Sequence, residues 1–238
     1  MLKPLFCSAL LISTFSSCEV MNNLPQTIGV TQSEAGQGIR EALDQGVGQG
    51  IGVLSKTDGF FGSQAYKLFL PKDAQRIEST LRQVGLSSLV DKAILQINRS
   101  AEDAVAFARP IFYEAIKDMT IADALNIIKG PKNAATDYFK QRTTEKLMAA
   151  FMPVIKASLD KFSATKYYGE MVTTYNNFPT TMNKLNPDLT SYVVGKTVDA
   201  LFDQVAHEEE NIRSNPLART TDILKKVFGS TMKSYSKL

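Results

Sequence analysis

His207 is the only histidine in the sequence and stands directly before three glutamates, so it is the first place to look for metal or acid–base chemistry. In a helix, side chains at i+1 and i+2 point away from each other, and only Glu210 and Asp203 would share a face with His207. A transition-metal site needs three or four ligands, and the sequence has no second histidine to supply one. We therefore interpret this run as a solvated helix face, and we expect no metal site and no cofactor.

Two pairs of charged or polar residues have spacings that a helix would bring together. Arg99 and Glu102 could form a buried ion pair or an anion-binding edge. The alternative is an exposed pair that contributes only tenths of a kcal/mol to the stability of the protein. Thr120 and Asp123 have the spacing of a helix N-cap and its reciprocal partner. Capping is therefore the favoured role for Asp123.

The sequence AATDYF at residues 134–139 contains the hydroxyl of Thr136 and the phenol of Tyr138, and the guanidinium of Arg142 follows shortly after it. Thr136, Tyr138 and Arg142 either converge on a polar pocket, or Tyr138 packs with only its hydroxyl in water, and we favour packing. We assign no catalytic residue. The candidate polar pocket predicted from the sequence contains Arg99, Glu102, Asp123, Thr136, Tyr138 and Arg142.

The composition excludes several classes of protein. The 238 residues are 44% hydrophobic, which is enough for a core, and 27 Lys and Arg balance 24 Asp and Glu to a net charge of +3. A disordered tail and a strongly basic nucleic-acid binder are therefore excluded. The lysines near the C-terminus are scattered and lack interleaved aromatic residues, so we expect no nucleic-acid partner.

Residues 1–17 have the basic start, short apolar run and small-residue end of a secretory signal. The ending before Cys18 resembles the lipobox of bacterial lipoproteins, with Phe15 where leucine is usual, and we expect Cys18 to be the lipid attachment site. An ordinary signal cut near Ser17 and a buried N-terminal segment are the alternatives. The predicted location is the bacterial cell envelope, as a periplasm-facing or surface lipoprotein, with a soluble periplasmic protein as the alternative.

Residues 18–33 have no periodicity and are predicted to be a flexible tether, followed by a helical domain over residues 34–238. Thr31 and Glu34 resemble a capping box. The first helix carries an apolar stripe at four-residue spacing, beside a row formed by Gly38, Ala42, Gly46 and Gly50. Because glycine weakens a helix, we expect this row to allow a close helix approach, and charged neighbours make a membrane-inserted segment the less favoured alternative.

The rest of the chain shows helical periodicity almost throughout. We predict an all-α bundle of about seven to eight helices, because only residues 66–70 favour a short extended segment. Residues 88–119 are predicted to form one long helix kinked at Pro110, and residues 133–162 another that bends at Pro153. Shorter helices are predicted after Pro71, after Thr120, and over 164–176, 189–213 and 221–228.

Three stretches together resemble a bacterial family known as domain of unknown function 4197, and the similarity covers residues 39–229. The family pattern implies an exported helical domain and supplies no activity, substrate or catalytic residue, while the glycine-rich first helix departs from it. The stretches are NRSAE with ARPIF at residues 98–112, MTIADA with AATDYF at 119–139, and LF, EEENIR and VFG at 201–229.

We therefore expect an exported, lipid-anchored helical protein that binds a partner protein or an apolar small molecule between its helices. One alternative is a carboxylate- or metal-dependent enzyme that uses Glu102, Asp123 and Glu210. A second is a homo-oligomer packed through the glycine-rich helix. The sequence favours binding over catalysis because it lacks the usual catalytic groups.

Overall fold

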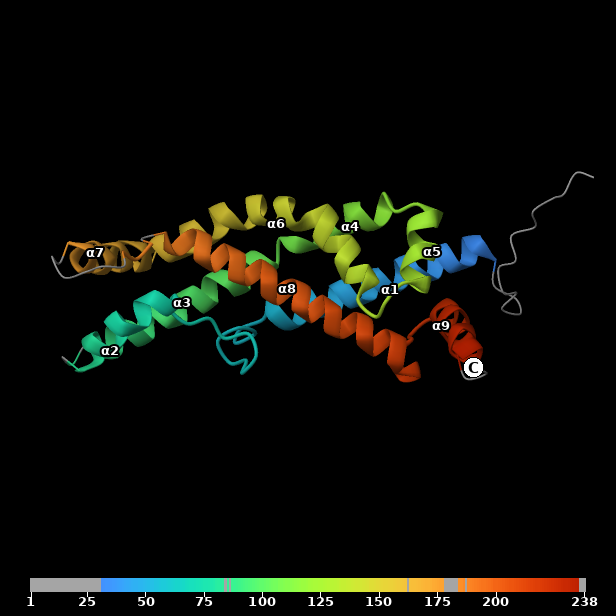
Figure 1. Ribbon diagram of the computed structural model, residues 1–238, viewed down its shortest axis with the longest axis horizontal. Coiled ribbons are helices and arrows are strands. Elements are labelled where there is room, and N and C mark those ends of the chain that lie inside the picture. The colour runs from blue at the N-terminus through green and yellow to red at the C-terminus, as the bar shows by residue number, and fades with distance from the viewer. Residues whose placement is uncertain are drawn as a thin grey trace, which may run out of the picture.

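Helix α1 (Gln32–Leu54) runs from the middle of the molecule to one of its ends, and several later helices pack against it (Figure 1). This computed structural model describes residues 31–83, 85, 87–161, 163–177, 184–186 and 188–235, so the predicted signal and Cys18 lie outside the described residues. The other helices are α2 (Gln75–Gln83), α3 (Ser87–Val105), α4 (Ala108–Lys117), α5 (Ile121–Lys129), α6 (Ala134–Lys161), α7 (Ala164–Asn176), α8 (Leu189–Ser214) and α9 (Asp222–Tyr235), with short 3-10 turns at Lys72–Ala74 and Pro216–Ala218.

The fold is an all-α bundle, as predicted, and the described residues contain no strand. Helices α6 and α8 are the long elements, and they pack against each other, with α3 and α4 also against α6 and α1 against α8. Phe112, Phe139 and Phe202 meet edge to face in the core, with ring centroids 5.0 and 6.0 Å apart. These rings tie α4, α6 and α8 together.

The glycine row of α1 lets two helices approach closely, as predicted. A Cβ built at Gly50 would lie 3.3 Å from Gln204 of α8, and one at Gly38 would lie 2.8 Å from Val227 of α9. The row is therefore covered by α8 and α9 of the same chain. This packing compensates for the intrinsic cost of glycine in a helix.

The prediction of one long helix over residues 88–119 is wrong. Helix α3 ends at Val105 and α4 begins at Ala108, so the helix is interrupted close to the position where a kink was expected. Pro110 lies in the first turn of α4, where its missing N–H would have had no helical partner. By contrast, α6 continues through Pro153, as predicted.

Residues 55–71, which we call the strap, connect α1 to the 3-10 turn before α2 and contain no strand. The expected extended segment at 66–70 is instead held by a side chain, because the amide of Asn98 accepts from Leu68 N at 2.8 Å and donates to Leu68 O at 2.8 Å. Phe60, Leu68 and Leu70 bury their side chains beneath the strap. The strap is thus fixed to α3 through Asn98.

Candidate functional site

An open groove of about 720 Å³ lies between α5 and α6. We call it the α5–α6 groove. Its volume is within the range of small-ligand and peptide sites. Two residues of the predicted pocket, Asp123 and Tyr138, line it. The other lining residues are Asn126, Ile127, Gly130, Pro131, Ala134, Asp137, Lys140 and Gln141.

Asp123 lies near the start of α5 and Tyr138 near the start of α6, and hydrogen bonds hold each of them in place. The Thr120 hydroxyl accepts from Asp123 N at 3.1 Å and the Asp123 carboxylate accepts from Thr120 N at 3.0 Å, so the predicted capping box is present. Hydrogen bonds from Thr120 keep the pKa of Asp123 below its usual range. Asp123 is therefore ionised at neutral pH while it caps α5.

Tyr138 combines packing with a polar tip. Its hydroxyl donates to Ala115 O at 3.3 Å, and the Arg142 guanidinium lies 5.5 Å from the centre of its ring. Burial raises the pKa of the Tyr138 phenol, and the Asp123 carboxylate raises it further while Arg142 opposes this. The structure thus brings Asp123, Tyr138 and Arg142 into one neighbourhood at the groove.

Thr136 points away from the groove and into the core. Its backbone N–H and hydroxyl both donate to Glu209 of α8, at 2.9 and 2.8 Å, and Ala135 N donates to the same carboxylate at 3.0 Å. These amides belong to the first turn of α6, which leaves such N–H groups without helical partners. Glu209 therefore acts as a cap for α6 that comes from another helix.

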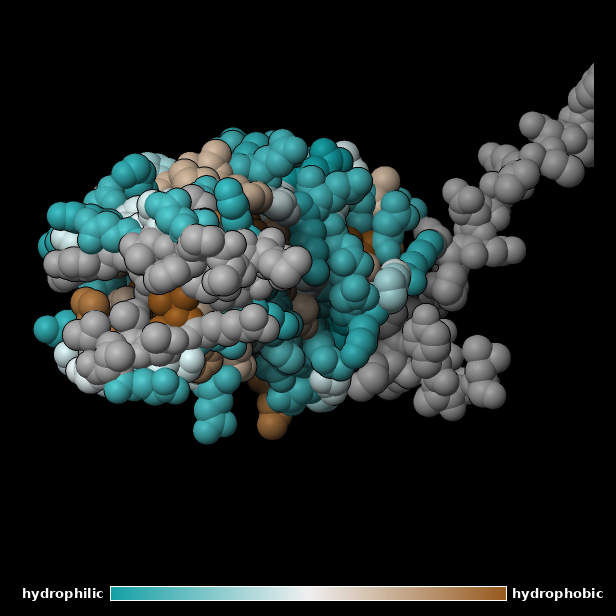
Figure 2. Space-filling model, turned by 60° about the vertical axis from the view of Figure 1, so that its left-hand side comes forward, coloured by the Kyte–Doolittle hydropathy of each residue, from teal (hydrophilic) through white to brown (hydrophobic). Residues whose placement is uncertain are grey.

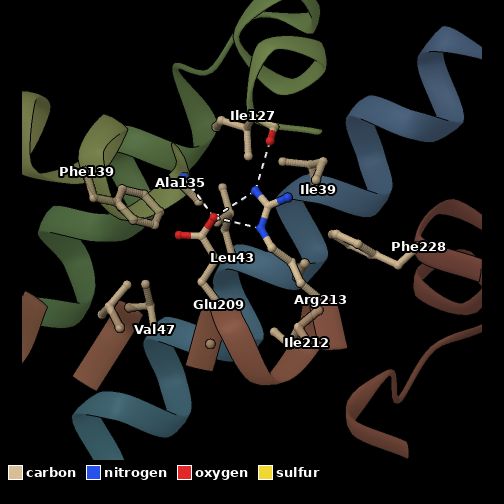
Figure 3. Close-up of a pocket in the computed structure, with 13 residues that line it drawn as sticks. Ile39, Leu43, Val47, Ile127, Ala135, Phe139, Glu209, Ile212, Arg213 and Phe228 are labelled. Carbon is tan, nitrogen blue, oxygen red and sulfur yellow. Dashed lines mark hydrogen bonds and ion pairs between the residues drawn. The ribbon is translucent and has the colours of Figure 1, made fainter. Parts of the chain in front are cut away.

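Arg213 completes this network, which Figure 3 shows. Its guanidinium binds Glu209 at 2.8 Å and donates to Ile127 O, near the end of α5, at 2.9 Å. The side chains of Glu209 and Arg213 are only 6% and 19% exposed. The interpretation of the glutamate run after His207 as a solvated helix face is therefore wrong for Glu209, because α5, α6 and α1 cover it together with Arg213. One carboxylate and one guanidinium thus join α5, α6 and α8.

Beside this pair is a small apolar cavity of about 20 Å³. Such a volume is sufficient for about one water molecule. Ile39, Leu43 and Val47 of α1 face Phe139 and the Glu209–Arg213 pair across it (Figure 3). The site between the helices is therefore much smaller than the α5–α6 groove outside. Ile127 lines both spaces.

Glu102 forms a second network of the same design. Its buried carboxylate accepts from the successive amides of Phe60 and Phe61 at 3.0 and 3.2 Å, and Arg99 pairs with it at 2.6 Å. Arg99 also binds Asp58 at 2.8 Å. The Glu102 carboxylate of this pair is therefore buried, whereas the Arg99 side chain is 30% exposed. Arg99 and Glu102 do not share the groove with Asp123.

The sequence model of the family described as "Protein of unknown function (DUF4197)" matches residues 29–229. The chain belongs to the DUF4197 family. Searches of curated proteins and of solved structures gave no match. In this DUF4197 protein, the stretches that carry the family resemblance contain Asn98, Glu102, Thr136, Glu209 and Arg213, which form the buried networks described above.

In this DUF4197 protein, the residues of the run at His207 lie in different environments. His207 is exposed and its Nε2 lies 3.4 Å from Asp203, the residue predicted to share its face. Glu210 is exposed and pairs with Lys132 at 3.3 Å, whereas Glu209 is buried. Within the described residues, no three His, Cys, Asp or Glu side chains are grouped closely enough to hold a metal ion.

Sequence reasoning missed the importance of Glu209 because its partners are more than 70 residues away in the chain. The only local signal was the four-residue spacing to Arg213.

The surface in Figure 2 is mainly hydrophilic, with scattered hydrophobic patches. None of the helices in the described part of the chain has the length and hydrophobicity that a membrane span requires.

Proposed function

We propose that this DUF4197 protein is an exported, lipid-anchored helical protein that binds a partner protein in the α5–α6 groove. The observation that carries the proposal is the contrast between the two spaces, about 720 Å³ in the groove and about 20 Å³ between the helices. A drug-sized apolar molecule needs several hundred Å³. The groove therefore supports a partner that binds from outside rather than a ligand enclosed in the bundle.

The lining of the groove supports a peptide segment as the bound element. Asn126 and Gln141 provide exposed amides, while Gly130, Pro131 and Ala134 provide a surface without long side chains. Such a mixture allows hydrogen bonds to a backbone and close approach to it. Asp123 and Asp137 add two negative charges, and Lys140 adds one positive charge.

The two alternatives have less support. The carboxylates named for an enzyme lie apart, since Glu102 binds strap amides, Asp123 caps α5, and Glu210 pairs with Lys132 on the surface. The glycines named for an oligomer interface contact α8 and α9 of the same chain. Each alternative therefore lacks the arrangement on which it was based.

The test is native mass spectrometry of the full-length protein extracted from its host membrane in mild detergent. We expect a chain that begins at acylated Cys18 and carries a bound protein. Gln141→Trp, which places a large side chain in the groove, should remove the bound protein and leave the acylated mass. Gln83→Trp, at an exposed position of α2, is the control. An unmodified monomer that begins at another residue would overturn the proposal.

A further inference from the structure

The strap displays two phenyl rings with a lysine between them. The Lys67 ammonium lies 4.1 Å from the centre of the Phe61 ring and 5.8 Å from that of Phe69. Phe69 is 51% exposed. Among the ion pairs of the described residues, none includes Lys67. The strap therefore presents apolar rings together with a positive charge for which the described part of the chain supplies no anionic partner.

The position of these side chains is fixed before any partner binds. Glu102 holds the amides of Phe60 and Phe61, and the Tyr192 hydroxyl of α8 donates to Phe69 O at 3.1 Å. Asn98 holds Leu68 between them. A surface that is already ordered loses little conformational entropy on binding, so a small patch is effective.

A second exposed apolar side chain belongs to another ordered segment. Leu217, in the 3-10 turn after α8, is 92% exposed. Its turn is held because Arg219, which is buried, donates to Ile212 O at 3.1 Å. Figure 1 shows that the strap and the turn after α8 both project from the lower edge, whereas α4 lies along the upper edge. The lower edge thus carries the two ordered segments to which the rings, the lysine and the leucine belong.

We propose that this edge is a membrane contact, in which Phe69 and Leu217 lie among phospholipid headgroups beside the half-buried ring of Phe61, and Lys67 pairs with a lipid phosphate. Aromatic and cationic side chains are favoured at this depth of a bilayer. Lys56 and Lys72, at the two ends of the strap, are exposed and add positive charge beside the rings. The proposal rests on the proposed function, because the lipid at Cys18 keeps the protein near the bilayer.

The dimensions of the chain allow both contacts at once. Helix α1 spans about 33 Å from its start to the strap at 1.5 Å per residue. The thirteen residues from Cys18 to Thr31 reach at most about 45 Å. The molecule can therefore lie with α1 along the membrane. Because the tether holds the strap at a high effective concentration, a weak contact is sufficient to orient the protein.

The experiment uses the absence of tryptophan from the sequence, which makes any introduced tryptophan the only indole and allows its emission to be excited selectively. Full-length acylated Phe69→Trp and Leu217→Trp are reconstituted on vesicles of phosphatidylcholine and phosphatidylglycerol that include brominated phosphatidylcholine. Both should show blue-shifted, quenched emission. Tyr113→Trp, at a 58% exposed position of α4, is the control and should show neither. Circular dichroism checks that each variant is folded.

A second substitution tests the lysine. Adding Lys67→Gln to Phe69→Trp should lower the ratio of docked to undocked protein about fivefold, as expected for one lysine at a lipid surface. Adding Lys92→Gln, at an exposed position of α3, should leave the quenching unchanged. Equal loss of quenching with both substitutions would contradict a role for Lys67.

Flotation of the same vesicles separates the two proposals. Protein that floats while Phe69→Trp stays unquenched would overturn the strap contact and leave the anchor. Lys67-dependent quenching of a chain that lacks the acyl group would support the strap contact and show that the contact does not depend on the anchor. Quenching of Phe69→Trp only when native membrane proteins are added would also overturn the proposal, because the strap would then bind a protein. Equal quenching of Tyr113→Trp would mean unspecific adsorption and would overturn it.

Discussion

Loss of the Glu209 charge should destabilise the protein more than any single surface substitution. Glu209→Gln keeps the shape of the side chain but replaces one carboxylate oxygen with an NH2 group. One oxygen now accepts from Ala135 N and Arg213, and the other accepts from Thr136, so the new donor must face another donor in either orientation. Arg213 would also lose its buried counter-ion.

The magnitude follows from burial. Breaking a fully buried ion pair costs about 3–5 kcal/mol, because the remaining charge is left without compensation. Arg213 is 19% exposed and keeps its bond to Ile127 O, so we expect the lower end of that range, about 3 kcal/mol. For a urea dependence of about 2–3 kcal/mol/M, the unfolding midpoint should fall by about 1–1.5 M.

The assay is urea unfolding followed by far-UV circular dichroism, with Glu210→Gln as the matched control. Glu210 is the next residue, is 53% exposed and pairs with Lys132 on the surface, so its substitution should change the free energy of unfolding by less than about 1 kcal/mol. A cycle with Arg213→Met should show coupling between Glu209 and Arg213. If Glu209→Gln and Glu210→Gln unfold at the same midpoint, the reasoning is wrong.

Three further predictions concern the strap, α1 and acid stability. Glu102→Gln should speed hydrogen exchange at the Phe60 and Phe61 amides, whereas Asp103→Asn, exposed and adjacent, should not; equal exchange in both variants would refute the role of Glu102. A Cβ at Gly48 would meet nothing within 4 Å, so Gly48→Ala should stabilise the protein by up to about 1 kcal/mol. Gly38→Ala should destabilise the protein, because its Cβ would lie too close to Val227. Melting temperatures that shift in the same direction in both variants would contradict this packing. Hydrogen bonds from Thr31 and Lys226 lower the pKa of Glu34 to about 2, so its contribution is present above about pH 4.5 and is lost as the pH falls towards 2. The drop in melting temperature between these pH values should be smaller in Glu34→Gln, and an unchanged drop would exclude Glu34 as a cause.

The capping boxes show what short stretches of sequence encode reliably. Thr31 with Glu34 and Thr120 with Asp123 were predicted from spacing alone, and both are present. Their hydrogen bonds join residues three apart, so one turn of helix determines them. The break between α3 and α4 was missed because Pro110 is compatible with a kink as well as with a helix start.

The candidate site was only partly predictable. The sequence placed Asp123, Tyr138 and Arg142 among its six candidates, and the structure brings these three together beside the groove. It placed Thr136 in the same set, but the orientation of that residue depends on α8, which lies more than 70 residues away in the chain. No helical periodicity carries information about such a partner.

The sequence by itself determined the all-α class, the helix caps, the apolar stripe of α1 and the small-residue row beside it, because these depend on contacts within a few residues. The tertiary structure alone decided that α8 and α9 cover that row, that Glu209 caps α6, and that Glu102 holds the strap. Those contacts join segments far apart in the chain. Each depends on the packing of the whole bundle, where a buried carboxylate must find donors wherever the fold supplies them.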